Sequence, residues 1–246
     1  QKGALASLER AIAQHPTPGR VAARLDLLRE RGGRAKPLQQ AADQALAQYP
    51  DAPQVLLSAG ALLQVAHAPD RAEECYRRRL ALVPEDVATR NNLAQLLLER
   101  GELEEAIELW REIAASDEII RLNYAQALQR RGDVLEAEAI YRAVLGQNPQ
   151  HPVALRGLAD ILAAAGDFDA ALALAEQALA RNPEHPRSWL MVAKLHQALG
   201  RHAQATELLL QGAQRVARPL PLHQALFNTW RHPGADATAL AHLQRW

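Results

Sequence analysis

The chain has 246 residues, and its 28 lysines and arginines are balanced by 28 aspartates and glutamates, so its formal net charge is zero. This balance argues against a strongly basic nucleic-acid-binding domain and against a general binder of anionic membranes. Hydrophobic residues make up 48% of the chain and aromatic residues only 4%, and the frequent Ala, Leu, Glu, Gln and Arg residues favour helices over strands. We therefore expect an all-α protein that does not bind nucleic acid.

The first helix is expected within residues 1–18. Ala4, Leu8 and Ala11 recur at the spacing of one helix face, and a proline follows them. The second helix of every repeat described below has the same pattern, so we interpret residues 1–18 as the second helix of a truncated repeat. We accordingly expect the natural protein to extend upstream of Gln1.

Residues 19–217 contain a repeat of about 34 residues, the length of a helix–turn–helix solenoid unit. Each unit has one marker position, from which the other recurring residues can be counted. A small residue generally lies seven positions before the marker, Ala usually lies five positions after it, and Pro often lies seventeen positions after it. A glycine at the marker would end the first helix of each unit by adopting a positive φ. The marker is occupied in turn by Gly33, His67, Gly101, Gly132, Gly166 and Gly200.

This register defines six units of unequal regularity. The first unit is degenerate because Asp26 and Leu38 replace its two small residues, and the third is three residues shorter than the others. The shortening leaves residues 114–118 to connect the third and fourth units, either as a tolerated deletion or as a hinge. The units are 19–52, 53–86, 87–117, 118–151, 152–185 and 186–217.

These units resemble the tetratricopeptide repeat (TPR) family. In the third unit the resemblance rests on Leu93, Ala94, Gly101, Ala106 and Trp110, and units two to six carry counterparts. It implies a right-handed α-solenoid of about six helix pairs, in which alanines let two helices approach closely and larger apolar residues fill the grooves between them. It also implies a non-enzymatic scaffold that binds a protein or an extended peptide in a concave groove, and it allows a homodimer.

The family resemblance places the concave groove at the second, fifth, sixth, ninth, twelfth and thirteenth residues of each unit. Amide side chains are frequent there, and they can hydrogen-bond a peptide backbone without reading its sequence. The alternative is an ordinary hydrated surface. Asp160 stands where chaperone adaptors carry the Asn of a clamp for a C-terminal carboxylate, which argues against that function. The predicted partner-binding residues are Gln54, Asn91, Asn92, Gln95, Asn123, Gln126, Arg130, Arg156, Arg187 and Lys194.

Residues 218–246 are expected to form capping or linker helices. They resemble the segment that joins the repeats to the catalytic half of bacterial SPINDLY-type O-GlcNAc transferases, although Leu243 and Gly234-Ala235 depart from that pattern. Asn92 and Asn123 also hold the sixth position of adjacent units, where these transferases carry a ladder of asparagines. The matching tail residues, in order, are His223, Leu226-Phe227, Asn228, His232-Pro233 and Arg245-Trp246.

The second resemblance implies that the chain is the substrate-recruiting region of a larger glycosyltransferase whose catalytic residues lie elsewhere. One alternative is a TPR scaffold of bacterial envelope assembly, in polysaccharide export or cytochrome maturation. A regulatory module of a bacterial signalling protein is a third. For the tail itself, the alternative is that Phe227, Trp230 and Trp246 simply cap the open end of the solenoid.

No sequence motif for reaction chemistry was found: there is no glycine-rich phosphate loop, nucleophile elbow or metal-binding helix motif. We therefore expect no catalytic residue, no metal and no cofactor. Cys75 is the single cysteine, and we expect it to be packed and inert. His151 and His185 fall in equivalent turns between repeats, which indicates a repeat effect rather than a cluster of ligands.

Two expectations concern the charged and apolar stretches of the chain. The consecutive residues Arg77, Arg78 and Arg79 point to different faces of one helix, and we expect all three to be solvated. No apolar run is long enough for a transmembrane helix, which predicts no membrane insertion. We expect a cytoplasmic protein, or a periplasmic one if an upstream signal peptide has been removed.

Overall fold

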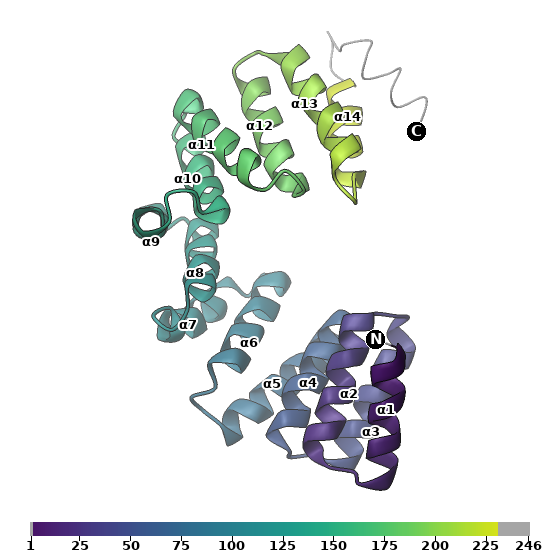
Figure 1. The fold of residues 1–246 in the computed structure, drawn as a ribbon. Coiled ribbons are helices and arrows are strands. Elements are labelled where there is room, and N and C mark those ends of the chain that lie inside the picture. The colour runs from purple at the N-terminus through teal and green to yellow at the C-terminus, as the bar shows by residue number, and fades with distance from the viewer. Residues whose placement is uncertain (1, 231–246) are drawn as a thin grey trace. The chain divides into compact units, whose positions relative to one another are not determined.

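The computed structural model describes residues 2–230, and within this range it contains fourteen α-helices and no strand (Figure 1). The prediction of an all-α protein built from helix pairs is thereby confirmed. The chain divides into two compact units, residues 1–127 and 128–246, which we call the N-terminal unit and the C-terminal unit. Each helix of the described region falls short of the length and apolarity needed to cross a membrane.

The N-terminal unit consists of stacked antiparallel helices. Helices that follow one another in the chain pack together as pairs, and α4 additionally contacts α2 and α3, so the apolar faces of neighbouring pairs share one core. The last helix, α8, continues across the boundary into the C-terminal unit. The helices are α1 (Lys2–Gln14), α2 (Pro18–Arg31), α3 (Ala35–Gln48), α4 (Pro53–Val65), α5 (Pro69–Leu82), α6 (Val87–Arg100), α7 (Leu103–Ile113) and α8 (Glu118–Arg131).

The C-terminal unit repeats the same arrangement. Helix α10 packs against α9 and α11, α12 packs against α11 and α13, and α14 contacts both α12 and α13. Proline occupies the first turn of α10 and of α12, where its missing N–H leaves no hydrogen bond unmade. The helices are α9 (Val134–Gln147), α10 (Pro152–Ala164), α11 (Phe168–Arg181), α12 (Pro186–Ala198), α13 (His202–Arg215) and α14 (Leu220–Trp230).

The marker position of each repeat has the backbone conformation that the sequence predicts. At Gly101 φ is +84°, and its N–H donates to the carbonyl of Leu98 over 3.2 Å, which closes the end of α6. His67 occupies the equivalent position with a φ of +56° and is the one non-glycine residue with a positive φ in the described range. The four remaining markers also have positive φ: Gly33, Gly132, Gly166 and Gly200.

Small residues let the paired helices approach closely. Ala94, Ala106 and Ala171 are fully buried, as predicted. Within the C-terminal unit the aromatic ring of Tyr141 lies directly against the backbone of Gly157. A Cβ atom at Gly157 would lie only 2.3 Å from Cζ of this ring, so α9 and α10 pack more closely than any larger residue would allow.

Helix α14 covers one side of the last helix pair. Leu222 and Leu226 are fully buried in a cluster with Trp189 and Leu209, whereas Phe227 has 45% of its surface exposed. The two leucines therefore supply the buried contacts on this side. The side chain of Trp230 and the tail residues His232-Pro233 and Arg245-Trp246, together with the predicted second short helix, lie outside the described residues.

The expectation that three consecutive arginines are solvated is wrong for Arg79. Arg77 and Arg78 have 46% and 40% of their side chains exposed, but Arg79 has only 14%. Its Nε donates to Oδ2 of Asp86 over 2.6 Å, and this carboxylate also accepts a hydrogen bond from Thr89. Because Asp86 directly precedes α6, the ion pair fixes the end of α5 against the start of α6.

Candidate partner-binding site

The ten predicted partner-binding residues lie on α4, α6, α8, α10 and α12, the first helices of their pairs. The structure divides them by chemistry between the two units. The N-terminal unit contains the six amide side chains, of which Gln54 is exposed and Asn91, Asn92, Gln95, Asn123 and Gln126 are half-buried. The C-terminal unit contains the four basic side chains: Arg130, Arg187 and Lys194 are exposed, and Arg156 is buried.

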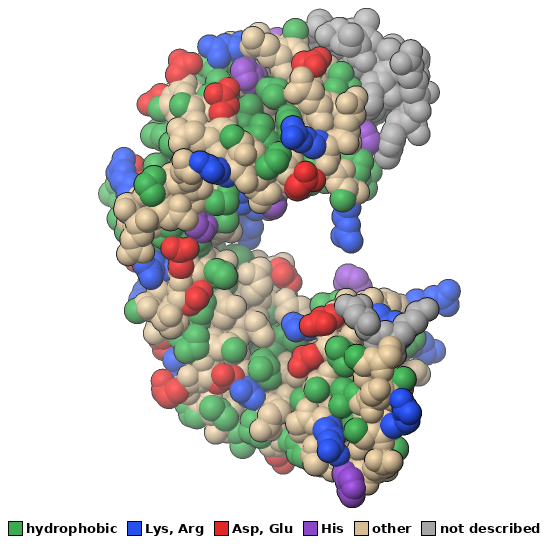
Figure 2. All heavy atoms as spheres, viewed as in Figure 1, with side chains coloured by type: hydrophobic (Ala, Val, Ile, Leu, Met, Phe, Trp, Pro, Cys, Tyr) green, Lys and Arg blue, Asp and Glu red, His purple; other side chains and the backbone are tan. Residues whose placement is uncertain are grey.

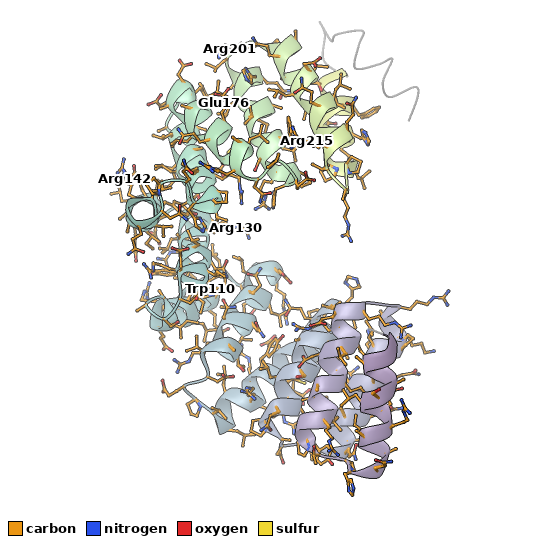
Figure 3. The ribbon with its side chains drawn as sticks, viewed as in Figure 1. Trp110, Arg130, Arg142, Glu176, Arg201 and Arg215 are labelled. Carbon is orange, nitrogen blue, oxygen red and sulfur yellow. The ribbon has the colours of Figure 1, made fainter. Side chains whose placement is uncertain are left out.

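Two of the predicted amides lie within hydrogen-bonding distance of each other. Nδ2 of Asn123 on α8 donates to Oδ1 of Asn91 on α6 over 3.4 Å. The same oxygen accepts a hydrogen bond of 3.0 Å from Nε1 of Trp110, which is fully buried on α7 (Figure 3). Asn91 thus has a structural role that the groove prediction did not anticipate, while its bond to Asn123 joins the amides of two successive repeats.

A second set of hydrogen-bonded polar side chains lies on α4, α5 and α6 of the N-terminal unit. The hydroxyl of buried Tyr76 donates to Oε1 of Gln64 over 3.2 Å, and Nε2 of Gln64 donates to Oε2 of Glu99 over 3.2 Å. Nε2 of the predicted residue Gln95 donates to the other oxygen of Glu99 over 3.4 Å. Amide groups of α4 and α6 are thus hydrogen-bonded to neighbouring side chains within the N-terminal unit.

Arg156 lies deeper in the C-terminal unit than a groove residue was expected to lie. Only 8% of its surface is exposed, and its Nη1 atom is buried without a hydrogen-bond partner among the described residues. Burial is the main cause that lowers the pKa of Arg156, and the nearby charge of Arg187 acts in the same direction. Asp160 and Tyr141 act in the opposite direction but more weakly.

Asp160 lies one helical turn after Arg156 on α10 and completes a charged cluster. Although Asp160 is exposed on the helix, the protein atoms crowded around its carboxylate raise its pKa. The positive charges of Arg187, Lys194 and Arg156, in that order, act to lower the same pKa. Three cations and one carboxylate are therefore brought together by α10 and α12, a grouping that repeat positions alone did not reveal.

The histidines in the repeat turns serve as helix caps. Nδ1 of His151 accepts a hydrogen bond from the N–H of Ala154 over 3.4 Å, and Nδ1 of His185 accepts one from the N–H of Arg187 over 3.2 Å. They begin α10 and α12, consistent with their interpretation as a repeat effect. Within residues 2–230 no three His, Cys, Asp or Glu side chains are grouped so that they could hold a metal ion.

Cys75 is packed against its neighbours, as predicted. It is 3% exposed, and burial raises the pKa of its thiol to about 11. Because the thiolate is the reactive form of cysteine, the thiol is inert near neutral pH.

The repeated helix pairs, with polar residues on the first helix of each pair, define a helical-repeat scaffold. Family models described as tetratricopeptide repeat match residues 20–184 and residues 162–226. The chain therefore belongs to the tetratricopeptide repeat family, whose fold is typical of protein–protein interaction, and its repeats form a non-catalytic scaffold domain. No curated protein matches the chain.

Solved structures with the same fold come from proteins of several kinds. A TPR protein from Parabacteroides merdae is 17% identical with a TM-score of 0.74, and the match covers 90% of this chain and 89% of that one. PilW, a type IV pilus biogenesis factor, is 24% identical with a TM-score of 0.64, and the match covers 78% and 91%. The structure of the APC/C hetero-tetramer Cut9–Hcn1 contains a chain that is 16% identical with a TM-score of 0.68. The match covers 98% of the present protein but only 51% of the Cut9–Hcn1 chain. Identities this low establish a shared fold and nothing further.

Proposed function

We propose that this chain binds an extended segment of a partner protein along the amide side chains of α6 and α8 in the N-terminal unit. The hydrogen bond between Asn91 and Asn123 supports this most directly, because it connects the amides of two successive repeats. A peptide backbone offers one donor and one acceptor per residue, and each amide side chain offers both. Asn92 and Gln126 are half-buried neighbours of this pair on the same helices.

The proposal is tested by capturing partners with wild-type protein and with the double variant Asn92→Ala/Asn123→Ala. The bait is the full chain, the source is a lysate of the native cells, and captured proteins are identified by mass spectrometry. The affinity of a captured partner is then measured for both proteins. The matched control is Gln44→Ala/Gln48→Ala, which removes two exposed amides from α3, the second helix of its pair.

We expect the Asn92/Asn123 variant to bind the captured partner at least tenfold more weakly and the Gln44/Gln48 variant to bind it as wild type does. Equal affinity of all three proteins would contradict the proposal. Circular dichroism of each variant distinguishes lost binding from lost fold.

We further propose that the scaffold is the substrate-recruiting region of a larger SPINDLY-like glycosyltransferase. The support is the pair of asparagines at the sixth position of adjacent units and the order of His223, Leu226-Phe227 and Asn228 in the tail. In this proposal the repeats present an acceptor protein to a catalytic domain encoded outside this chain. The competing proposal is a scaffold of bacterial envelope assembly, in polysaccharide export or cytochrome maturation.

The identities of the captured proteins separate these two proposals. Acceptors that carry O-linked sugar in the native cell, and that the Asn92/Asn123 variant fails to capture, would support the recruiting role. Components of an envelope assembly machine would support the scaffold role and contradict the recruiting role. Fractionation of native cells tests the proposed cytoplasmic or periplasmic location, and light scattering tests the proposed homodimer.

A further inference from the structure

The first helices of two successive repeats in the C-terminal unit, α10 and α12, hold a cluster of charged side chains. Helices α10 and α12 contact each other directly and contribute Arg156, Arg187 and Lys194 around the single carboxylate of Asp160. The face of the C-terminal unit seen in Figure 2 carries Lys and Arg side chains beside Asp and Glu. Three cations around one anion leave an excess of positive charge that a negatively charged partner would neutralise.

Arg156 is the member of this cluster that most clearly lacks a partner. It is 8% exposed, and its buried Nη1 donates no hydrogen bond within residues 2–230. Asp160, on the same face of α10 one turn later, does not accept from this atom. An unpaired buried donor is costly, and the planar guanidinium fork matches a carboxylate better than any neutral acceptor. A ligand carboxylate would supply the missing acceptor once the Arg156 side chain turns toward solvent, because Nη1 is buried in the unbound protein.

The spacing of the exposed cations indicates more than one anionic group. Arg187 and Lys194 are seven residues apart on α12, which corresponds to about 10 Å along the helix axis. In the extended polyproline II conformation, which has three residues per turn and a rise of about 3.1 Å per residue, side chains three residues apart lie on one face and about 9 Å apart. Acidic side chains three residues apart on an extended segment would therefore reach both cations, whereas a single carboxylate would reach only one.

We propose that Arg156, Arg187 and Lys194 form a binding site for an extended segment of a partner protein that carries aspartate or glutamate side chains about three residues apart. This inference names the chemistry of the partner and rests on the proposed peptide-binding function. It assigns acidic recognition to the C-terminal unit and backbone recognition to the amides of the N-terminal unit. The two contributions can consequently be removed separately.

The test uses fluorescein-labelled peptides of glycine and serine, with binding followed by fluorescence anisotropy. The first peptide has two glutamates three residues apart and an amidated C-terminus. The second has glutamines in their place and is also amidated. The third has the same glutamines and a free C-terminal carboxylate. The protein is the full chain, as wild type and as Arg187→Gln/Lys194→Gln, which alters only exposed side chains.

The control variant Arg142→Gln/Arg201→Gln removes the same amount of charge from the same unit, at side chains that are 64% and 45% exposed (Figure 3). We expect the glutamate peptide to bind wild type and the control variant equally, and to bind Arg187→Gln/Lys194→Gln at least tenfold more weakly. We expect the glutamine peptides to bind at least tenfold more weakly than the glutamate peptide.

Three results would overturn the inference: no binding of the glutamate peptide, equal binding by both variants, or binding only of the peptide with a free C-terminus. The last result would assign the site to a terminal carboxylate instead of an acidic segment. The Asn92→Ala/Asn123→Ala variant separates this inference from the proposed function. If capture of the native partner depends on the asparagines but the glutamate peptide does not bind, only the acidic site is rejected. If the glutamate peptide binds but capture does not depend on the asparagines, only the amide groove is rejected.

Discussion

The indole N–H of Trp110 donates a hydrogen bond to the side-chain carbonyl of Asn91 over 3.0 Å, joining α7 to α6 within one repeat. Trp110 is fully buried, so this N–H has no access to water. Asn91 therefore satisfies a core donor while it also accepts from Asn123. Its position on the first helix of the pair predicted a residue of the binding groove. In the structure, Asn91 instead contributes to the stability of the repeat by accepting a hydrogen bond from the core.

Asn91→Ala should lower the free energy of unfolding by about 1–3 kcal/mol, because it leaves the buried indole N–H without an acceptor. The matched change Asn92→Ala, at the adjacent half-buried amide, should cost less than about 0.5 kcal/mol. Urea denaturation monitored by circular dichroism measures both. Adding Trp110→Phe to Asn91→Ala removes the orphaned donor and should make the two changes less than additive; full additivity would argue that the hydrogen bond contributes nothing.

Gly157→Ala should destabilise the C-terminal unit by about 1–3 kcal/mol, because its new Cβ would lie 2.3 Å from the buried ring of Tyr141. Gly146 provides the matched control, since it also lies in a helix but a Cβ there would meet no atom within 4 Å. Gly146→Ala should stabilise the protein by up to about 1 kcal/mol through its higher helix propensity. Thermal melting should shift in opposite directions for the two variants, and a shared direction would show that the ring contact does not limit packing.

Ala171→Leu should lower stability by about 1–3 kcal/mol, because this fully buried alanine faces the partner helix and has no room for a larger side chain. Ala106→Leu should behave in the same way in the N-terminal unit. Ala173→Leu, at an exposed position of the same helix α11, should change stability by less than about 0.5 kcal/mol. Chemical denaturation measures all three, and unchanged stability of the first two would contradict the assigned repeat register.

Asp86→Asn should lower stability at neutral pH by about 1.5–3 kcal/mol, since it weakens the half-buried bonds from Arg79 and Thr89. Burial raises the pKa of Asp86, but those hydrogen bonds and the charge of Arg79 together lower it below its ordinary value of 3.8. A lowered pKa stabilises the fold above pH 3.8, and this contribution is lost as the pH falls through the pKa of the folded state. The difference between wild type and variant should consequently shrink below about pH 4.

Urea denaturation across this pH range tests the Asp86 prediction, and Asp51→Asn is its control. Asp51 also pairs with an arginine, at 3.0 Å from Arg78, but 75% of its side chain is exposed. An exposed ion pair of this kind contributes less than about 1 kcal/mol. A difference that does not change with pH, or that is equal for the two aspartates, would contradict the assigned role of Asp86.

The repeat period, the ends of the first helices and the buried alanines could be predicted because they depend on local chemistry. Positive φ at the markers follows from the conformational freedom of glycine, and even the exception, His67, was placed correctly by its spacing alone. The candidate site was predictable only as a set of positions on the first helices. Which of those positions are exposed depends on side chains from neighbouring helices, as the burial of Arg156 shows.

By itself, the sequence determined that this protein is an all-α stack of TPR helix pairs, since spacing, small residues and turn residues all favour that one arrangement. Only the tertiary structure decided which hydrogen bonds and charge interactions the polar residues of the first helices make. Trp110 lies 19 residues from Asn91 and Asn123 lies 32 residues from it, yet the three meet at one oxygen atom. Arg156 and Arg187 are likewise brought together by the packing of α10 and α12. Hydrogen bonds and charge interactions act over a few ångströms, so they depend on how helices pack and not on how residues are spaced along one helix.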